Sequence, residues 1–96
     1  MACLTIEELK TILRSLPGWE PHDNALVKTF RVPSFSHGIV LMGAIAQVAE
    51  AADHHPDLNL HSYNQLTIKL STHSEGGVTM QDIDLAEQIE RIPKRV

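Results

Sequence analysis

Cysteine is almost absent from this sequence, and long apolar runs and basic clusters are missing as well. The single cysteine, Cys3, excludes an internal disulfide framework and is typical of a reducing compartment. No segment reaches the roughly 18 uninterrupted apolar residues of a membrane span, and no basic region followed by an apolar run opens the chain. We therefore expect a cytoplasmic protein that is not inserted in a membrane.

Positive charge is also scarce. Eight Lys and Arg residues stand against twelve Asp and Glu residues, which gives a net charge of −4, and the longest basic run is Lys94-Arg95. Proteins that bind nucleic acid by neutralising phosphates carry a basic surface. We therefore expect no direct nucleic-acid binding.

The length bounds the architecture. Ninety-six residues, 43% of them apolar, predict one globular domain over residues 1–96. Hydrophobic periodicity and capping patterns predict helices over residues 5–16, 34–52 and 79–92 and strands over residues 25–32, 58–63 and 66–70, with a short extended piece before a turn at 22–24. This order predicts an α+β fold, with one mostly antiparallel four-stranded sheet and three helices packed on one face.

The helix expected over residues 34–52 is apolar around most of its circumference. Such a helix has to be covered on more than one side. The sheet of the same subunit covers one side, and in so small a domain a second subunit is the candidate for the other. The pattern thus predicts a homo-oligomer, either a dimer or a tetramer.

Residues 50–82 hold four of the six histidines: His54, His55, His61 and His73. Imidazoles exchange protons near neutral pH, so this density of histidines marks the candidate active site. Glu50 and His54 are four residues apart and would share one face if the helix continued that far. Pro56 disfavours helical geometry at His55, which points this residue elsewhere.

The placement of His73 is left open by the sequence. Strict alternation puts it on the polar face of the strand that begins at Leu66, away from an apolar face covered by helices. The end of the strand, its twist or a neighbouring subunit could still bring His73 to His54. Asp82, in the first turn of the last helix, either orients a histidine or caps its helix.

Together these spacings resemble the signature of the pterin-4a-carbinolamine dehydratases. The matching positions are Glu50, His54, His55, Pro56, Tyr63, His73 and Asp82. The similarity covers nearly the whole chain and includes the pair Gly18-Trp19. The chain departs from the commonest family form between Pro56 and Tyr63, where it is one residue longer than many members and has Leu58 in place of a usual aromatic residue.

The resemblance implies a reaction and a set of roles. Family members dehydrate a 4a-hydroxytetrahydropterin to quinonoid dihydropterin, without a metal or an organic cofactor, so that the pterin of aromatic amino acid hydroxylases is recycled. Carried over by position, the catalytic set is His54, His55 and His73. The supporting and substrate-binding set is Glu50, Asp53, Ser71, Thr72 and Asp82. Which histidine acts as acid and which as base stays open.

Two alternative functions are also compatible with parts of this pattern. The three histidines and a carboxylate could hold zinc for hydrolysis, although adjacent histidines rarely converge on one ion and no His-x-x-x-His spacing occurs. The chain could also be a protein-interaction module, because some members of the family act as dimerisation partners of a transcription factor. The apolar helix over residues 34–52 would then be the binding surface.

Overall fold

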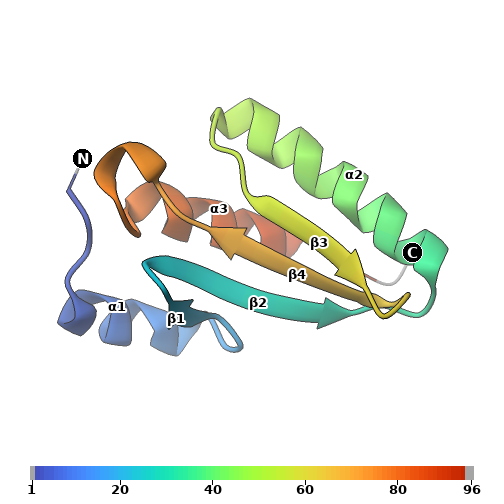
Figure 1. Cartoon of the computed structure of the whole chain (residues 1–96), viewed down its shortest axis with the longest axis horizontal. Coiled ribbons are helices and arrows are strands. Elements are labelled where there is room, and N and C mark those ends of the chain that lie inside the picture. The colour runs from blue at the N-terminus through green and yellow to red at the C-terminus, as the bar shows by residue number, and fades with distance from the viewer. Residues whose placement is uncertain (1, 95–96) are drawn as a thin grey trace.

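Three α-helices, two 3₁₀ turns and four strands make up residues 2–94, the part of the chain that this computed structural model describes. The helices are α1 (Ile6–Ile12), α2 (Phe35–Ala52) and α3 (Met80–Arg91), and the 3₁₀ turns are η1 (Leu13–Ser15) and η2 (His73–Glu75). The strands are β1 (Glu20–His22), β2 (Ala25–Arg31), β3 (Asp57–His61) and β4 (Gln65–Leu70). Figure 1 shows their arrangement, with α2 running beside β3.

All neighbouring strands of the sheet are antiparallel, in the order β1-β2-β4-β3. In the central pair, Leu26 lies opposite Leu70 and Phe30 opposite Leu66. Because side chains alternate along a strand, these residues point to one face and the residues between them point to the other. The sheet therefore has one apolar face and one polar face, and the predicted α+β class is confirmed.

The core lies between the apolar face of the sheet and all three helices. Leu9 of α1, Leu41 and Ile45 of α2, and Leu85 and Ile89 of α3 are buried in one cluster with the inner residues of the strands. The helices thus pack on the same face, as expected. Burying one apolar face of a sheet and one stripe of each helix is what stabilises this two-layer arrangement.

Capping residues begin each helix where the sequence places them. Thr5 accepts a hydrogen bond from the backbone N–H of Glu8, whose carboxylate accepts one in return, and the same reciprocal pattern joins Thr79 and Asp82. Ser34 caps α2. Each cap satisfies backbone N–H groups that have no partner within the helix, so these starts are local properties of the sequence.

The second hairpin differs from the prediction. β3 ends at His61 instead of continuing to Tyr63, because Ser62 and Tyr63 have φ values of 51° and 56° and form the turn into β4. A turn with two left-handed residues matches the twist of an antiparallel pair. Ser62 and Tyr63 are not the Asn or Gly that usually marks such a turn, so the turn could not be predicted from these two residues. The Tyr63 side chain is exposed.

Helix α2 has two apolar sides, of which one is buried and the other is exposed. By length and composition alone it could cross a membrane. Its Leu41, Ile45 and Ala49 are buried in the core beneath the sheet, although only 22% of the helix residues are buried. Three other large apolar side chains of α2, those of Phe35, Ile39 and Val40, are each more than half exposed.

Candidate active site

A left-handed residue ends α2 and directs the histidines that follow. Asp53 has φ 50° and ψ 43°, and its backbone N–H donates to the carbonyl of Glu50 over 3.2 Å. The N–H of His54 donates back to the carbonyl of Ala49 over 3.1 Å. Hydrogen bonds of this kind close a helix at a left-handed residue. The chain therefore leaves the helical path before it reaches His54.

Because of this turn the helix does not continue to His54, so Glu50 and His54 do not share one helix face. The carboxylate of Glu50 instead meets the next histidine, with Oε2 lying 2.5 Å from Nε2 of His55. His54 turns to α3, where its Nε2 lies 2.6 Å from Oδ1 of Asp82. The i, i+4 relation requires a continuous helix, and the positive φ at Asp53 removes that condition.

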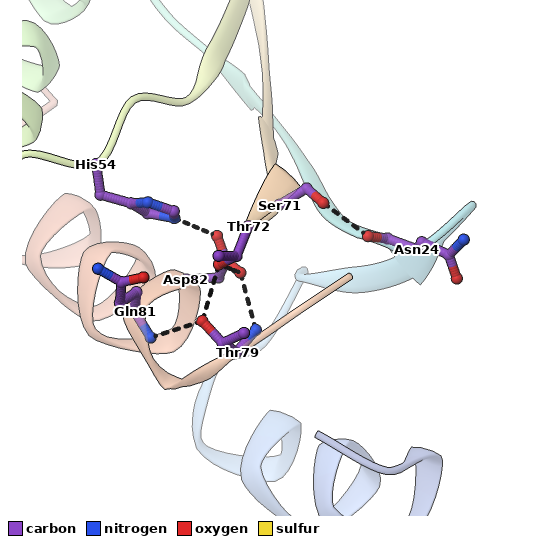
Figure 2. A network of polar contacts seen from close by, with 7 residues as sticks. All are labelled: Asn24, His54, Ser71, Thr72, Thr79, Gln81 and Asp82. Carbon is purple, nitrogen blue, oxygen red and sulfur yellow. Dashed lines mark hydrogen bonds and ion pairs between the residues drawn. The ribbon is translucent and has the colours of Figure 1, made fainter. Parts of the chain in front are cut away.

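Asp82 is the centre of a buried network, which Figure 2 shows from close by. The carboxylate is fully buried. Its Oδ2 accepts hydrogen bonds from the Thr72 hydroxyl over 2.8 Å and from the backbone N–H of Thr79 over 2.9 Å. Since Oδ1 meets His54, every oxygen of this buried group has a partner, which is the condition under which a carboxylate can be kept in a protein interior.

The end of β4 determines where His73 lies relative to His54. The last strand residue is Leu70, and Thr72 continues the inward alternation, so that it is buried and bonds Asp82. An isolated bridge between Thr72 and Gly77 then closes a small loop whose first residues form η2. His73 begins that turn and is exposed. The end of the strand thus brings His73 into the same region as His54.

All three predicted catalytic histidines line a single hollow of 370 Å³. Its walls are formed by Asp53, His54, His55, Ser71, Thr72, His73, Ser74 and Gln81. Most of the predicted substrate-binding residues are therefore at the hollow, but Glu50 and Asp82 are not. These two carboxylates reach it through the histidines that they contact. A volume of this size is within the range of small-molecule sites.

Three residues at the site were missed by the sequence analysis. Ser74 and Gln81 line the hollow, and Thr79 bonds both Asp82 and the Thr72 hydroxyl. The sequence contains a capping-box pattern at Thr79, and this pattern predicts the hydrogen bond between Thr79 and Asp82. Nothing local pointed to Ser74 or Gln81, which reach the hollow because η2 and the start of α3 lie beside it.

A larger hollow of 460 Å³ lies elsewhere, beside the N-terminal segment and the tip of the first hairpin. Its lining is mostly apolar, with residues such as Leu4, Leu9 and Val78, and its titratable side chains are those of Cys3, His22 and Asp23. The smaller hollow is the candidate active site, because it holds three imidazoles, which exchange protons near neutral pH, whereas the larger one holds a single imidazole. Within residues 2–94 no group of three or more His, Cys, Asp or Glu side chains is arranged to hold one metal ion.

The sequence matches known proteins over nearly its whole length. The family model described as Pterin 4 alpha carbinolamine dehydratase matches residues 2–92. A protein of Mycobacterium avium (strain 104), itself only provisionally named a pterin-4-alpha-carbinolamine dehydratase, is 44% identical over 92 residues, which is 96% of this chain and 97% of that protein. A Sulfolobus acidocaldarius protein of the same provisional name is 42% identical over 85 residues, 88% of this chain and 92% of its own.

Solved structures agree with this fold. The crystal structure of a transcriptional coactivator/pterin dehydratase from Brucella melitensis has a TM-score of 0.85 and 38% sequence identity, and it covers 92% of this chain and 95% of its own. A pterin dehydratase-like protein identified as a RuBisCO assembly factor in the alpha-carboxysome has a TM-score of 0.60 at 18% identity, covers 75% of this chain and 82% of its own, and shows a shared fold alone. Sequence and structure together show that the chain belongs to the pterin 4 alpha carbinolamine dehydratase family.

Proposed function

We propose that this protein dehydrates 4a-hydroxytetrahydropterin to quinonoid dihydropterin and water, as a step in the recycling of tetrahydrobiopterin. The observation that carries the proposal is the meeting of His54, His55 and His73 around one hollow in a chain of this family. The reaction breaks the bond between C4a and the hydroxyl oxygen. It requires one group that protonates the departing hydroxyl and another that removes a proton from a ring nitrogen.

Imidazoles can perform both tasks near neutral pH, because their reference pKa is about 6.5. The three histidines differ in their surroundings. The His54 side chain is 12% exposed and bonds a buried carboxylate, whereas the His55 side chain is 60% exposed and bonds an exposed one. His73 is exposed on η2. This difference supports distinct roles in one site, with His54 held rigidly and the other two open to solvent.

The remaining polar groups of the hollow support pterin binding. A pterin ring presents amide-like donors and acceptors along its edge, and the hollow offers the Asp53 carboxylate and the hydroxyls of Ser71 and Ser74 beside it. Ser71 also donates to the carbonyl of Asn24 over 2.9 Å, which ties the end of β4 to the first hairpin. We assign pterin binding to these groups and give Glu50 and Asp82 the task of orienting histidines.

The test is the dehydration of freshly generated 4a-hydroxytetrahydropterin, followed by absorbance. We expect the wild type to accelerate the reaction above its spontaneous rate, and His54→Ala and His73→Ala to lower kcat by about a hundredfold or more, the usual contribution of a general acid or base. The matched control is His61→Ala, because His61 bonds Thr67 on β4 and does not line the hollow. A folded wild type that does not accelerate the dehydration above its spontaneous rate would contradict the proposal.

We also propose that two copies of this chain associate through the exposed side of α2. The support is the row of exposed apolar side chains, Phe35, Ile39 and Val40, on a helix whose opposite side is buried. Removing such side chains from water contributes roughly 25 cal/mol per Å² of buried apolar area. The coactivator role in the name of the Brucella protein makes a foreign partner the competing occupant of this surface.

Sedimentation at micromolar concentration decides between these occupants. We expect a dimer or a larger assembly for the wild type and a lower mass for Val40→Glu, which places a charge on the apolar surface. Thr11→Glu, which adds the same charge to the exposed side of α1, is the control. A monomeric wild type would rule out self-association and leave the surface to another protein.

A further inference from the structure

The donors around Asp82 impose a direction on each of its hydrogen bonds. The backbone N–H of Thr79 can only donate, so Oδ2 is an acceptor. The hydroxyl of Thr72 donates to the same oxygen. Oδ1 faces Nε2 of His54 at 2.6 Å. Because an imidazole nitrogen is a much stronger base than a carboxylate oxygen, the proton between these two atoms belongs to Nε2.

The hydrogen bonds of the two threonine hydroxyls, those of Thr72 and Thr79, also have fixed donors and acceptors. Their oxygens lie 2.8 Å apart, and the single proton of Thr72 is already directed at Asp82. The proton of Thr79 therefore goes to Thr72, and the oxygen of Thr79 accepts the backbone N–H of Gln81 over 3.2 Å. Thr72 and Thr79 are both buried, so water does not compete for these bonds. One chain of donors runs from the first turn of α3 to the carboxylate.

The other ring nitrogen of His54, Nδ1, takes no part in this network. It makes no hydrogen bond within residues 2–94, yet no buried side-chain nitrogen or oxygen of these residues lacks a partner. Nδ1 therefore keeps contact with solvent. His54 is also one of the residues that line the hollow.

We propose that Thr72 and Thr79 are positioning residues that fix the His54 tautomer, with the proton on Nε2 and the lone pair of Nδ1 open to the bound pterin. The nitrogen that carries the proton in a histidine is set by the hydrogen bond of the other nitrogen. Here the two hydroxyls and the Thr79 N–H hold Asp82 as an acceptor toward His54. The role of Nδ1 toward a pterin rests on the proposed function, whereas the tautomer does not.

The ¹⁵N chemical shifts of the His54 side chain, measured where the imidazole is neutral, report the tautomer directly. We expect a protonated Nε2 in the wild type. In Asp82→Asn the side-chain oxygen must still accept from Thr79 and Thr72, so its NH₂ group faces His54. The proton should then move to Nδ1, and kcat should fall by about a hundredfold or more, since the wrong tautomer is presented.

Thr72→Val tests the hydroxyl chain. It removes one of the two donors that hold Oδ2 of Asp82, so Oδ1 is no longer fixed at Nε2 of His54. We therefore expect a mixture of both His54 tautomers and a fall in kcat with little change in KM. Thr72→Ser keeps the hydroxyl and should restore both readouts. The matched control is Thr67→Val, which breaks another threonine pair with a 2.8 Å contact, that of Thr67 with Thr29 on the polar face of the sheet. It should leave the His54 spectrum unchanged.

The outcomes separate this inference from the proposed function. A wild-type His54 with its proton on Nδ1 would overturn the inference, and so would a Thr72→Val variant that matches the wild type in spectrum and rate. A protonated Nε2 in a protein without dehydratase activity would keep the inference and remove the proposed function. The wild-type spectrum tests the tautomer without any variant, whereas the role of Thr72 is tested by comparing Thr72→Val with Thr72→Ser, provided that both variants fold.

Discussion

Nε2 of His54 lies 2.6 Å from Oδ1 of Asp82 and joins the turn after α2 to the first turn of α3. A second pair of the same chemistry joins His55 to Glu50. The first pair is largely buried and the second is exposed. The two pairs therefore contribute differently to stability, although their distances are nearly equal.

Removing the buried carboxylate should cost much more stability than removing the exposed one. Asp82→Ala leaves buried donors without an acceptor, so we expect the free energy of unfolding to fall by about 3 kcal/mol. Glu50→Ala breaks a solvated pair and should change it by less than about 1 kcal/mol. Urea denaturation followed by the fluorescence of the single tryptophan measures both. Equal losses would show that burial does not distinguish the pairs.

The left-handed turn at Asp53 should favour glycine over alanine. An L-residue with a Cβ pays roughly 1–2 kcal/mol for this backbone conformation, whereas glycine adopts it freely. We expect Asp53→Gly to be more stable than Asp53→Ala by about 1 kcal/mol in thermal or urea unfolding. Both variants lose the same carboxylate, so their difference isolates the backbone. A more stable alanine variant would contradict the left-handed geometry.

The two glycines of α2 should respond in opposite ways to alanine. A Cβ at Gly38 would lie 2.6 Å from Cδ1 of Leu60 on β3, whereas nothing lies within 4 Å of a Cβ at Gly43. Gly43→Ala should gain roughly 0.5–1 kcal/mol from helix propensity. Gly38→Ala should lose about 1–3 kcal/mol relative to it, because α2 and β3 must separate or Leu60 must move.

Both variants should be unfolded at a protein concentration at which the wild type is monomeric, or at the lowest practical concentration. Self-association then does not contribute to the measured stabilities. If Gly38→Ala were as stable as Gly43→Ala, the close approach of α2 to β3 would be refuted.

The titration of Lys94 should make the free energy of unfolding depend on pH above neutrality. Its ammonium donates to the carbonyls of Ile89 and Glu90, and burial lowers its pKa, with Lys28 adding to the effect and the Glu90 charge opposing it. Because the folded-state pKa lies below the unfolded value, the unfolded chain binds more protons between the two, and stability rises with pH through that window.

We therefore expect the free energy of unfolding of the wild type to rise relative to Lys94→Met as the pH increases toward 10.5, the ordinary lysine value. Urea midpoints of both proteins at two alkaline pH values give the difference. A difference that stays constant, or that falls as the pH rises, would contradict the lowered pKa.

Local signals were enough for much of the fold. Thr5 and Thr79 begin their helices as the sequence indicates, because a cap depends on residues within one turn. For α2 the sequence offers Ser34 or Ser36 as the cap, and the structure has Ser34. The alternation of Leu66, Ile68 and Leu70 predicts the buried face of β4 for a similar reason, since side chains in a strand alternate strictly. Periodicity and capping therefore predicted the class and the layers.

The sequence by itself determined which elements form and which histidines to consider, since spacing and chain order are read directly along one dimension. The tertiary structure alone decided the partners of those histidines. The positive φ at Asp53 ends the helix before His54, so that His54 meets Asp82 and His55 meets Glu50. Spacing alone does not reveal this arrangement, because Asp adopts the left-handed conformation only occasionally, and because His54 meets Asp82, 28 residues away in sequence, only where α3 packs beside the end of α2.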